Sequence, residues 1–209
     1  MQRIVPRHFS MLRDFHLADF FTLGNAACGV GGVLFAMLYM SSQLPFHFFA
    51  AAALALPAAF AFDVLDGRIA RARHQHSALG RELDSLADIV SFGVAPAALG
   101  FAAGLQGGWD AAALIYFVCC GVSRLARYNV TAETLDAGSG KVSHFEGTPI
   151  PTSVLLTALL ALAAWQGHVG DKLYGGAFLI GPWLLHPAAL LFVLSGSLMI
   201  SKTLRIPKL

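Results

Sequence analysis

Two pairs of aspartates stand at helical spacing near the middle of the chain. Asp63 and Asp66 are three residues apart, and Asp84 and Asp88 are four residues apart. On a helix, either interval places both side chains on one face, about one turn from each other. Carboxylates supply only oxygen ligands, which suit hard divalent ions such as Mg²⁺, Mn²⁺ or Ca²⁺ better than zinc. Two such ions, about 3.5–4 Å apart, are a usual arrangement for in-line displacement at phosphorus.

Arginines near the aspartates allow a simpler interpretation. Arg68, Arg71 and Arg73 are close enough in sequence to form salt bridges with acids at a membrane interface. Two glycines, Gly67 and Gly80, favour a ligand site instead, because each lies within about one turn of an aspartate. Glycine inside a helix costs about 1 kcal/mol relative to alanine. Its place beside the carboxylates leaves room for a ligand to approach the backbone.

The surrounding chain has the composition of a membrane protein. Of its 209 residues, 56% are hydrophobic and 12% are charged, whereas a soluble domain is about a quarter charged. A hydrocarbon core of about 30 Å requires roughly 20 apolar residues in a helix. We therefore expect an all-α fold with six transmembrane helices in one domain, over residues 18–201. The apolar blocks lie at residues 18–41, 46–65, 88–106, 109–123, 149–166 and 176–200.

The second and third expected helices contain the aspartates. The second helix would extend from about Pro45 through Asp66, and the third would begin near Glu82. A short basic loop joins them, so antiparallel packing would bring the two aspartate pairs together at one membrane face. Ionised carboxylates gathered there repel one another strongly, and acids in membrane segments are usually functional.

Both ends of the chain are basic. Residues 1–17 mix Arg3, Arg7 and Arg13 with large apolar side chains. This pattern predicts an amphipathic helix on the membrane surface, with a frayed tail as the alternative. We expect no cleavable signal peptide, because no small-residue cleavage pattern precedes the first apolar block. Residues 202–209 form a basic tail.

The distribution of Lys and Arg predicts the orientation. Loops rich in these residues remain in the cytoplasm, and thirteen of the fourteen cations fit six spans with both termini inside. Lys172 alone falls on the other side. The aspartates would then face the cytoplasm in an integral protein of the cell membrane. The net charge of +2 gives no indication of nucleic-acid binding, because these cations fit membrane topology, anionic lipid or substrate phosphate better.

The aspartates belong to a longer pattern of eight residues at fixed spacing between positions 63 and 88. This pattern matches every position of the motif of the CDP-alcohol phosphotransferase family, and the chain therefore resembles that family. The family's six-helix membrane core is also similar to the arrangement expected here. The matching residues are Asp63, Asp66, Gly67, Ala70, Arg71, Gly80, Asp84 and Asp88.

The resemblance implies a reaction and a set of metal ligands. In this family, a CDP-linked lipid or alcohol donates its phosphoryl group to a hydroxyl acceptor, and CMP leaves. By position, Asp63, Asp66 and Asp84 would hold two divalent cations, Mg²⁺ or Mn²⁺. Asp88 would complete the metal site and act as general base on the acceptor hydroxyl. The resemblance also implies a homodimer.

The remaining motif residues would form the nucleotide site. Gly67, Ala70 and Gly80 would line the cytidine pocket by resemblance, and Arg71 would steady the helix ends or the diphosphate. Asn25, in the first apolar block, requires a hydrogen-bond partner at membrane depth, which could be a site aspartate, the nucleotide or another helix. The candidates for this site are Asp66, Gly67, Ala70, Arg71, Gly80 and Asn25.

The flanking sequences indicate the acceptor. The stretches at residues 21–29, 85–97 and 123–130 resemble the phosphatidylserine synthase branch, in which CDP-diacylglycerol reacts with L-serine. Arg124 and Arg127 could bind the serine carboxylate, although topological anchoring or phospholipid contact would explain them equally well. Inositol phosphate or glycerol phosphate is the alternative acceptor, and it would also require arginines.

Two other function classes are open to a membrane protein with acidic residues. An ion transporter would place its acids near mid-membrane and would show inverted repeats with broken helices. A non-catalytic scaffold would give no reason for eight spaced residues. Small residues also recur along the third expected helix, and they allow close helix contact within one subunit or between two. These small residues are Gly93, Ala97, Gly100 and Gly104.

Overall fold

The computed structural model describes residues 16–41, 46–72, 78–136, 144–201, 203 and 205–207. The amphipathic helix expected over residues 1–17 lies almost entirely outside these ranges, as do Arg73 and parts of the basic tail.

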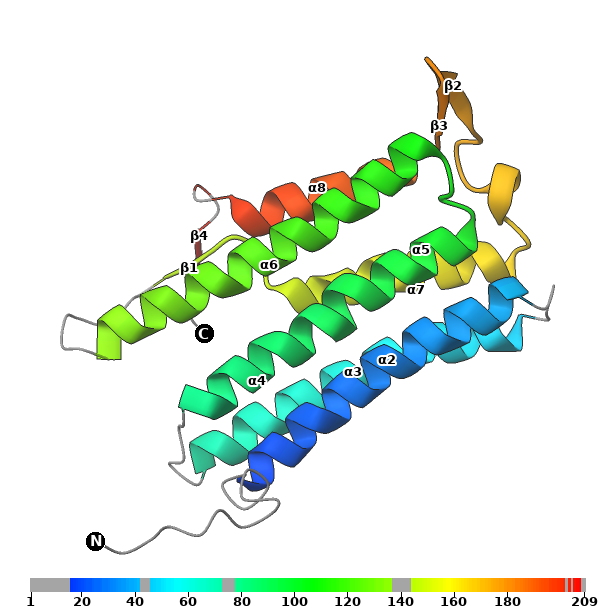
Figure 1. Cartoon of the computed structure of the whole chain (residues 1–209). Helices are drawn as coiled ribbons and strands as arrows, with labels where there is room; N and C mark the ends of the chain where they lie inside the picture. The colour runs from blue at the N-terminus through cyan, green and yellow to red at the C-terminus, as the bar shows by residue number, and fades with distance from the viewer. Residues whose placement is uncertain are drawn as a thin grey trace, which may run out of the picture.

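The described chain is mostly helical, as the apolar blocks predict (Figure 1). Four short strands form two antiparallel pairs, β1 with β4 and β2 with β3. The strands are β1 (His144–Glu146), β2 (Phe178–Ile180), β3 (Trp183–Leu185) and β4 (Arg205–Pro207). The helices are α2 (Leu17–Ser41), α3 (His47–Ala72), α4 (Ala78–Asp88), η1 (Ile89–Val94), α5 (Ala95–Ala103), α6 (Gly108–Asp136), η2 (Ile150–Thr152), α7 (Ser153–Trp165), η3 (Gly170–Lys172) and α8 (Ala189–Ile200).

Four helical segments of the described chain are long and apolar enough to cross a membrane. They are Leu17–Ser41, His47–Ala72, Leu79–Ala103 and Gly108–Thr131, and the third of them joins α4, η1 and α5. The last two predicted spans form shorter apolar helices, Ile150–Trp165 and Ala189–Ile200. At 1.5 Å per residue these reach only about 24 and 18 Å, less than the roughly 30 Å of a hydrocarbon core.

The helix that follows the basic loop begins earlier than the sequence predicted. Helix α4 begins at Ala78, four residues before the expected start near Glu82. Ala78 and Leu79 are good helix formers, so they extend the helix into the predicted loop. Glu82 therefore lies beyond the first helical turn, and both its carboxylate oxygens accept hydrogen bonds from Asn129 of α6.

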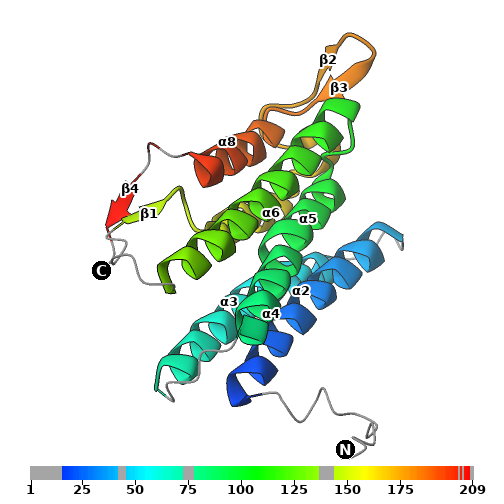
Figure 2. The same ribbon diagram turned by 60° about the vertical axis from the view of Figure 1, so that its left-hand side comes forward.

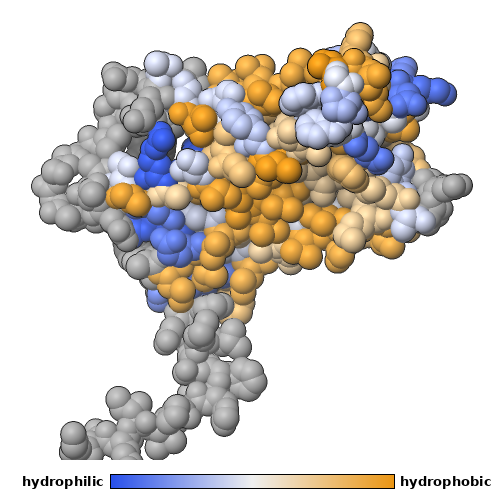
Figure 3. All heavy atoms as spheres, turned by 45° about the horizontal axis from the view of Figure 1, so that its top comes forward, coloured by the Kyte–Doolittle hydropathy of each residue, from blue (hydrophilic) through white to orange (hydrophobic). Residues whose placement is uncertain are grey.

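The helices pack into a bundle in which α2 and α3 lie side by side and α6 lies beside α8 (Figures 1 and 2). Phe49, Phe92, Phe117 and Phe192 are among the largest fully buried side chains. The rings of Phe117 and Phe192 meet edge to face with centroids 5.3 Å apart, which joins α6 to α8. Many large apolar side chains also face outward, and Figure 3 shows an apolar middle between hydrophilic ends. Such a surface suits lipid contact.

The small residues predicted along the third span make contacts within the chain. A side chain at Gly100 would come within 3.1–3.3 Å of Phe192, Leu105 and Leu114. Gly104 has a φ of 124° and lies against the backbone of Gly170. Close packing inside one subunit therefore explains why Gly100 and Gly104 are glycines.

Candidate active site

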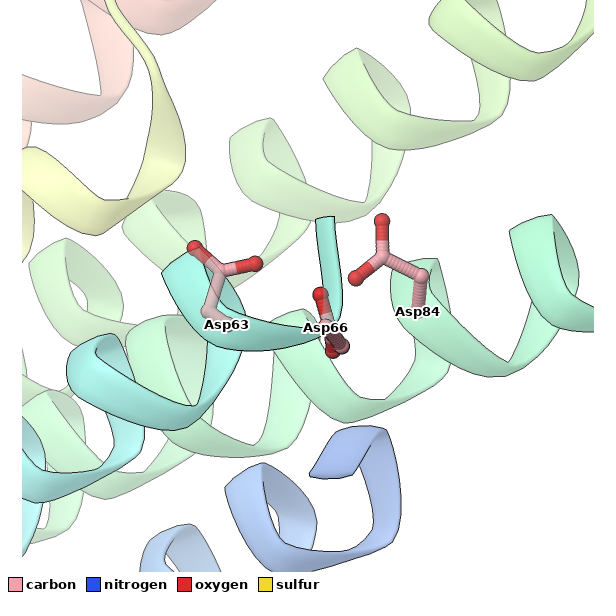
Figure 4. A group of neighbouring side chains, drawn as sticks. All are labelled: Asp63, Asp66 and Asp84. Atoms are coloured by element: carbon pink, nitrogen blue, oxygen red, sulfur yellow. The ribbon is translucent and has the colours of Figure 1, made fainter. Parts of the chain in front are cut away.

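Three aspartates from two helices converge at one end of the bundle (Figure 4). Asp63 and Asp66 lie in the last ten residues of α3, and Asp84 lies on α4. One carboxylate oxygen from each residue lies within 4.8 Å of the other two. Asp66 is buried and the other two are half-buried. Antiparallel packing of α3 and α4 therefore brings the two halves of the motif together, as their helical spacing predicts.

The cluster fits a bound cation better than a set of salt bridges. Oδ1 of Asp84 is buried and has no hydrogen-bond partner in the described structure. Within that part of the chain, no ion pair joins the three aspartates to Arg68 or Arg71. Three ionised carboxylates this close repel one another unless a positive charge lies among them. An all-oxygen set of this kind suits Mg²⁺, Mn²⁺ or Ca²⁺.

Asp88 occupies a separate position at the end of α4, one turn beyond Asp84. It is buried and is not one of the three aspartates that converge. Its Oδ1 accepts a hydrogen bond of 3.1 Å from Nδ2 of Asn25. The backbone directly after Asp88 forms the π-helix η1, and π-helical turns inside α-helices are frequent at functional sites. The fourth motif aspartate is thus held by a neutral amide and lies close enough to the other three for their charges to interact, but it is outside the group whose ligand atoms lie within 4.8 Å of one another.

Helix α2 contacts the site through hydrogen bonds. Oγ1 of Thr22 donates a 2.9 Å hydrogen bond to Asp66, and Oγ of Ser91 donates a 2.8 Å bond to the backbone oxygen of Asn25. A side chain at Gly29 would come within 2.4 Å of Ser91, so this glycine lets α2 approach η1 closely. Asn25 was expected from the sequence, whereas Thr22 and Ser91 were not. The signal for Thr22 was present, because Thr22, Asn25 and Gly29 recur at three and four residues within an apolar helix.

Apart from Asn25 on α2, the predicted nucleotide residues lie on α3 and α4, the helices that carry the aspartate cluster. Gly67 and Ala70 are half-buried on α3, and Gly80 is half-buried in the first turn of α4. Arg71 is exposed, and its Nη1 lies 3.6 Å from the point where a side chain at Gly67 would begin. Asn25 is completely buried, and its amide nitrogen is bonded to Asp88. Of the three partners considered for Asn25, the partner in the structure is therefore a site aspartate.

The two arginines predicted for the acceptor differ in their surroundings. Arg124 is half-buried on α6, and its charge interacts with that of Asp88. Its Nε is buried and has no hydrogen-bond partner in the described structure. Arg127 is exposed. Arg124 therefore lies near enough to Asp88 for the two charges to interact, without a salt bridge between them in the described structure, whereas Arg127 lies at the surface.

Asn129 connects α6 to α4 beside these arginines. Its Nδ2 bonds to the carboxylate of Glu82, and Ser85 donates a 3.1 Å hydrogen bond to its Oδ1. The link fixes α4 against α6, so that Arg124 and Asp88 lie on facing helices. This contact was not predicted from the sequence.

Comparison with known proteins identifies relatives of this chain. The family model described as CDP-alcohol phosphatidyltransferase matches residues 15–197. Three relatives are named CDP-diacylglycerol–serine O-phosphatidyltransferase. The Saccharomyces cerevisiae protein is 43% identical over 204 residues, which cover 96% of this chain and 74% of the relative. The Methanocaldococcus jannaschii protein is 31% identical, over 92% of this chain and 75% of the relative.

A bacterial relative matches over a shorter region. The Helicobacter pylori protein of the same name is 35% identical over 72% of this chain and 59% of its own length. The chain thus spans about three quarters of two of these relatives and less than two thirds of the third. The family model covers all eight motif positions and the four helices that position them. The chain belongs to the CDP-alcohol phosphatidyltransferase family.

Proposed function

We propose that this protein transfers the phosphatidyl group of CDP-diacylglycerol to the hydroxyl of L-serine, giving phosphatidylserine and CMP. The observation that carries the proposal is the convergence of Asp63, Asp66 and Asp84 from two helices of a membrane bundle. Family membership supports the reaction class. The names of the yeast, archaeal and bacterial relatives support serine as the acceptor.

The three converging aspartates would hold divalent cations, two Mg²⁺ or Mn²⁺ ions in the full site, with Asp88 as the fourth ligand predicted by the motif. When bound, such ions neutralise the charge of a diphosphate and stabilise the charge that develops on departing CMP. The unpartnered Oδ1 of Asp84 supports this assignment, because a cation would satisfy it.

Asp88 would serve as the general base. In the proposed step, the serine hydroxyl oxygen forms a bond to the phosphorus that carries diacylglycerol. The bond from that phosphorus to CMP breaks, and the hydroxyl proton passes to Asp88. An alcohol is a poor nucleophile, so a carboxylate placed against its proton assists the reaction. Asn25 would orient this carboxylate through its hydrogen bond to Oδ1, leaving Oδ2 to face the acceptor.

The nucleotide and acceptor would lie on opposite sides of the cluster. Gly67, Ala70 and Gly80 would line the cytidine pocket, as the motif implies, and Arg71 would contact the diphosphate. On the other side, the half-buried Arg124, whose charge is near that of Asp88, would bind the carboxylate of serine. The exposure of Arg127 makes it the weaker acceptor contact of the two.

The arrangement in the membrane follows from the same site. We propose that residues 18–201 form one membrane domain, with the aspartates and both termini in the cytoplasm, where the donor's head group meets water.

A homodimer stays a prediction of the family resemblance, and mass photometry in lipid nanodiscs would test it. An ion transporter is the competing function, but the converging aspartates lie away from the middle of their spans, in the last ten residues of α3 and at the sixth residue of Leu79–Ala103.

The test supplies purified protein with CDP-diacylglycerol, Mg²⁺ or Mn²⁺, and a panel of alcohols, and it measures CMP release. We expect release with L-serine and none after EDTA. Release with inositol phosphate or glycerol phosphate but not with serine would support the reaction class and would show that serine is not the acceptor. No release with any alcohol, together with cation flux in proteoliposomes, would support the transporter.

A further inference from the structure

Strands β2 and β3 form an apolar hairpin at the end of the bundle opposite the aspartates (Figures 1 and 2). Its eight residues, 178–185, contain no charged, amide, hydroxyl or carboxyl side chain. Phe178, Leu179, Ile180, Trp183 and Leu184 are all exposed, between 41% and 73%. A connection between helices that protruded into water would be expected to carry polar residues.

The hairpin is apolar on both faces. Residues paired across two antiparallel strands share a face, and neighbours along a strand alternate. Phe178 therefore lies on the same face as its partner Leu185, whereas Leu179 and its partner Leu184 lie on the other. A protein partner docks on one face of a two-stranded sheet, but lipid can surround both. The exposure of both faces indicates a lipid environment.

The chain holds the hairpin rigidly in this position. Nε1 of Trp109 donates a 2.9 Å hydrogen bond to the backbone oxygen of Ile180, and the rings of Trp109 and Trp183 meet edge to face at 5.3 Å. Gly108 allows this approach, because a side chain there would come within 2.5 Å of Trp183. The exposed apolar side chains are thus presented by a fixed element.

A buried polar contact fixes the base of the hairpin. The residue after β3, His186, donates from its backbone N–H to Asp110 of α6 at 2.7 Å, and its Nδ1 lies 2.6 Å from the same carboxylate. The two side chains are only 4% and 0% exposed. Asp110 also accepts from the backbone of Gly107, which ties the start of α6 to the hairpin.

The hairpin also continues the lipid-facing surface of the neighbouring helices. Trp109 at the start of α6 is 41% exposed, and Leu190 and Leu191 at the start of α8 are 52% and 43% exposed. Because the apolar segments Ile150–Trp165 and Ala189–Ile200 reach only about 24 and 18 Å, the hairpin between them adds apolar surface at the membrane boundary.

We propose that the β2–β3 hairpin is an anchor inserted into the boundary between lipid headgroups and acyl chains at the membrane face opposite the aspartates. The outer edges of a two-stranded sheet leave backbone groups unpaired, which is too costly in the hydrocarbon centre but tolerated where water and headgroups reach. Tryptophan is enriched at this depth. The inference rests on the membrane setting alone and is independent of the proposed enzymatic reaction.

Spin labels test the anchor on each face. Phe178→Cys and Leu179→Cys are made singly in the full chain with its three native cysteines changed to alanine, in phosphatidylethanolamine–phosphatidylglycerol nanodiscs. Lys172→Cys, exposed on η3 nearby, is the control. Collisions with O₂, which enters lipid, are compared with collisions with a water-soluble nickel chelate. We expect the O₂-to-nickel ratio at 178 and 179 to exceed that at 172 several-fold.

Two outcomes would overturn the anchor. Ratios at 178 and 179 equal to that at 172 would place the hairpin in water. A label shielded from both reagents on either face would show that protein covers it, and spin–spin broadening would identify that protein as a second copy. Ile180→Cys, on the same face as Phe178, replaces Phe178→Cys if that variant does not fold.

Discussion

At the scale of single residues, Asp84 has the clearest need for a cation, since its buried Oδ1 lacks a hydrogen-bond partner in the described structure. Asp84→Asn would remove one ligand charge. We expect CMP release to fall by at least about 100-fold, because bound metal contributes several kcal/mol and each 1.4 kcal/mol is about tenfold in rate. We also expect Mn²⁺ to raise the melting temperature of the parent protein, as a ligand of the folded state does, and to leave that of Asp84→Asn unchanged.

Glu82→Gln is the matched control for Asp84→Asn. It makes the same charge change on the same helix, and glutamine can still accept the hydrogen bond from Asn129. Activity within about twofold of the parent protein is expected, since surface substitutions away from special features change little. Equal losses in both variants would mean that the charge of α4, rather than a metal ligand, is responsible.

Asp88→Asn separates the proposed base from binding. Asparagine keeps the size of the side chain but cannot take the hydroxyl proton, so turnover should fall at least about 100-fold. Binding of CDP-diacylglycerol, measured by calorimetry in nanodiscs, should be retained. Retained turnover would show that Asp88 is not the general base.

Asn25→Ala tests the orientation of Asp88. A hydrogen bond to a charged group contributes about 1.5–3 kcal/mol, so kcat should fall by roughly 10- to 100-fold. Because the amide nitrogen of Asn25 bonds to Asp88, the affinity for CDP-diacylglycerol should change little. A large loss of affinity for CDP-diacylglycerol with unchanged kcat would instead indicate that Asn25 binds the nucleotide.

At the scale of elements, the approach of α2 to η1 decides whether the site assembles. A side chain at Gly29 would lie 2.4 Å from Oγ and 2.7 Å from Cα of Ser91. Gly29→Ala should therefore destabilise the protein by about 1–3 kcal/mol through overpacking. It should also lower turnover, because α2 carries Asn25. The measurements are thermal unfolding in detergent and CMP release.

Gly31→Ala is the matched control on the same helix. In the described part of the chain, no atom lies within 4 Å of a side chain added there. The substitution should leave stability unchanged or raise it by up to about 1 kcal/mol, since alanine is the better helix former. Destabilisation by both variants would show that α2 tolerates no added methyl group, and the specific contact with Ser91 would lose its support.

At the scale of the whole molecule, the two ends of the bundle should face opposite sides of the membrane. Arg127→Cys and Lys172→Cys, in the background without native cysteines, would be exposed to a membrane-impermeant maleimide. In right-side-out vesicles we expect labelling at 172 only, and in inverted vesicles at 127 only, because Lys and Arg favour the cytoplasmic side. The reverse pattern would place the aspartates outside.

The sequence by itself determined the chemistry and its place along the chain. Spacings of three and four residues put each aspartate pair on one helix face, and the long apolar blocks imposed a helical membrane protein. These properties are local, because they depend only on the period of a helix and on hydrocarbon solubility. The motif alone was therefore enough to identify Asp63, Asp66 and Asp84 as residues that meet at one site.

Only the tertiary structure decided which other side chains join them. Asn25 bonds to Asp88, Thr22 bonds to Asp66, and Arg124 is half-buried near the charge of Asp88 whereas Arg127 is exposed. The last two apolar blocks became short helices joined by a hairpin, although their composition suited two full spans. The physical reason is that helical spacing fixes a face, whereas the rotation and offset of one helix against another come from side-chain packing between segments far apart in sequence.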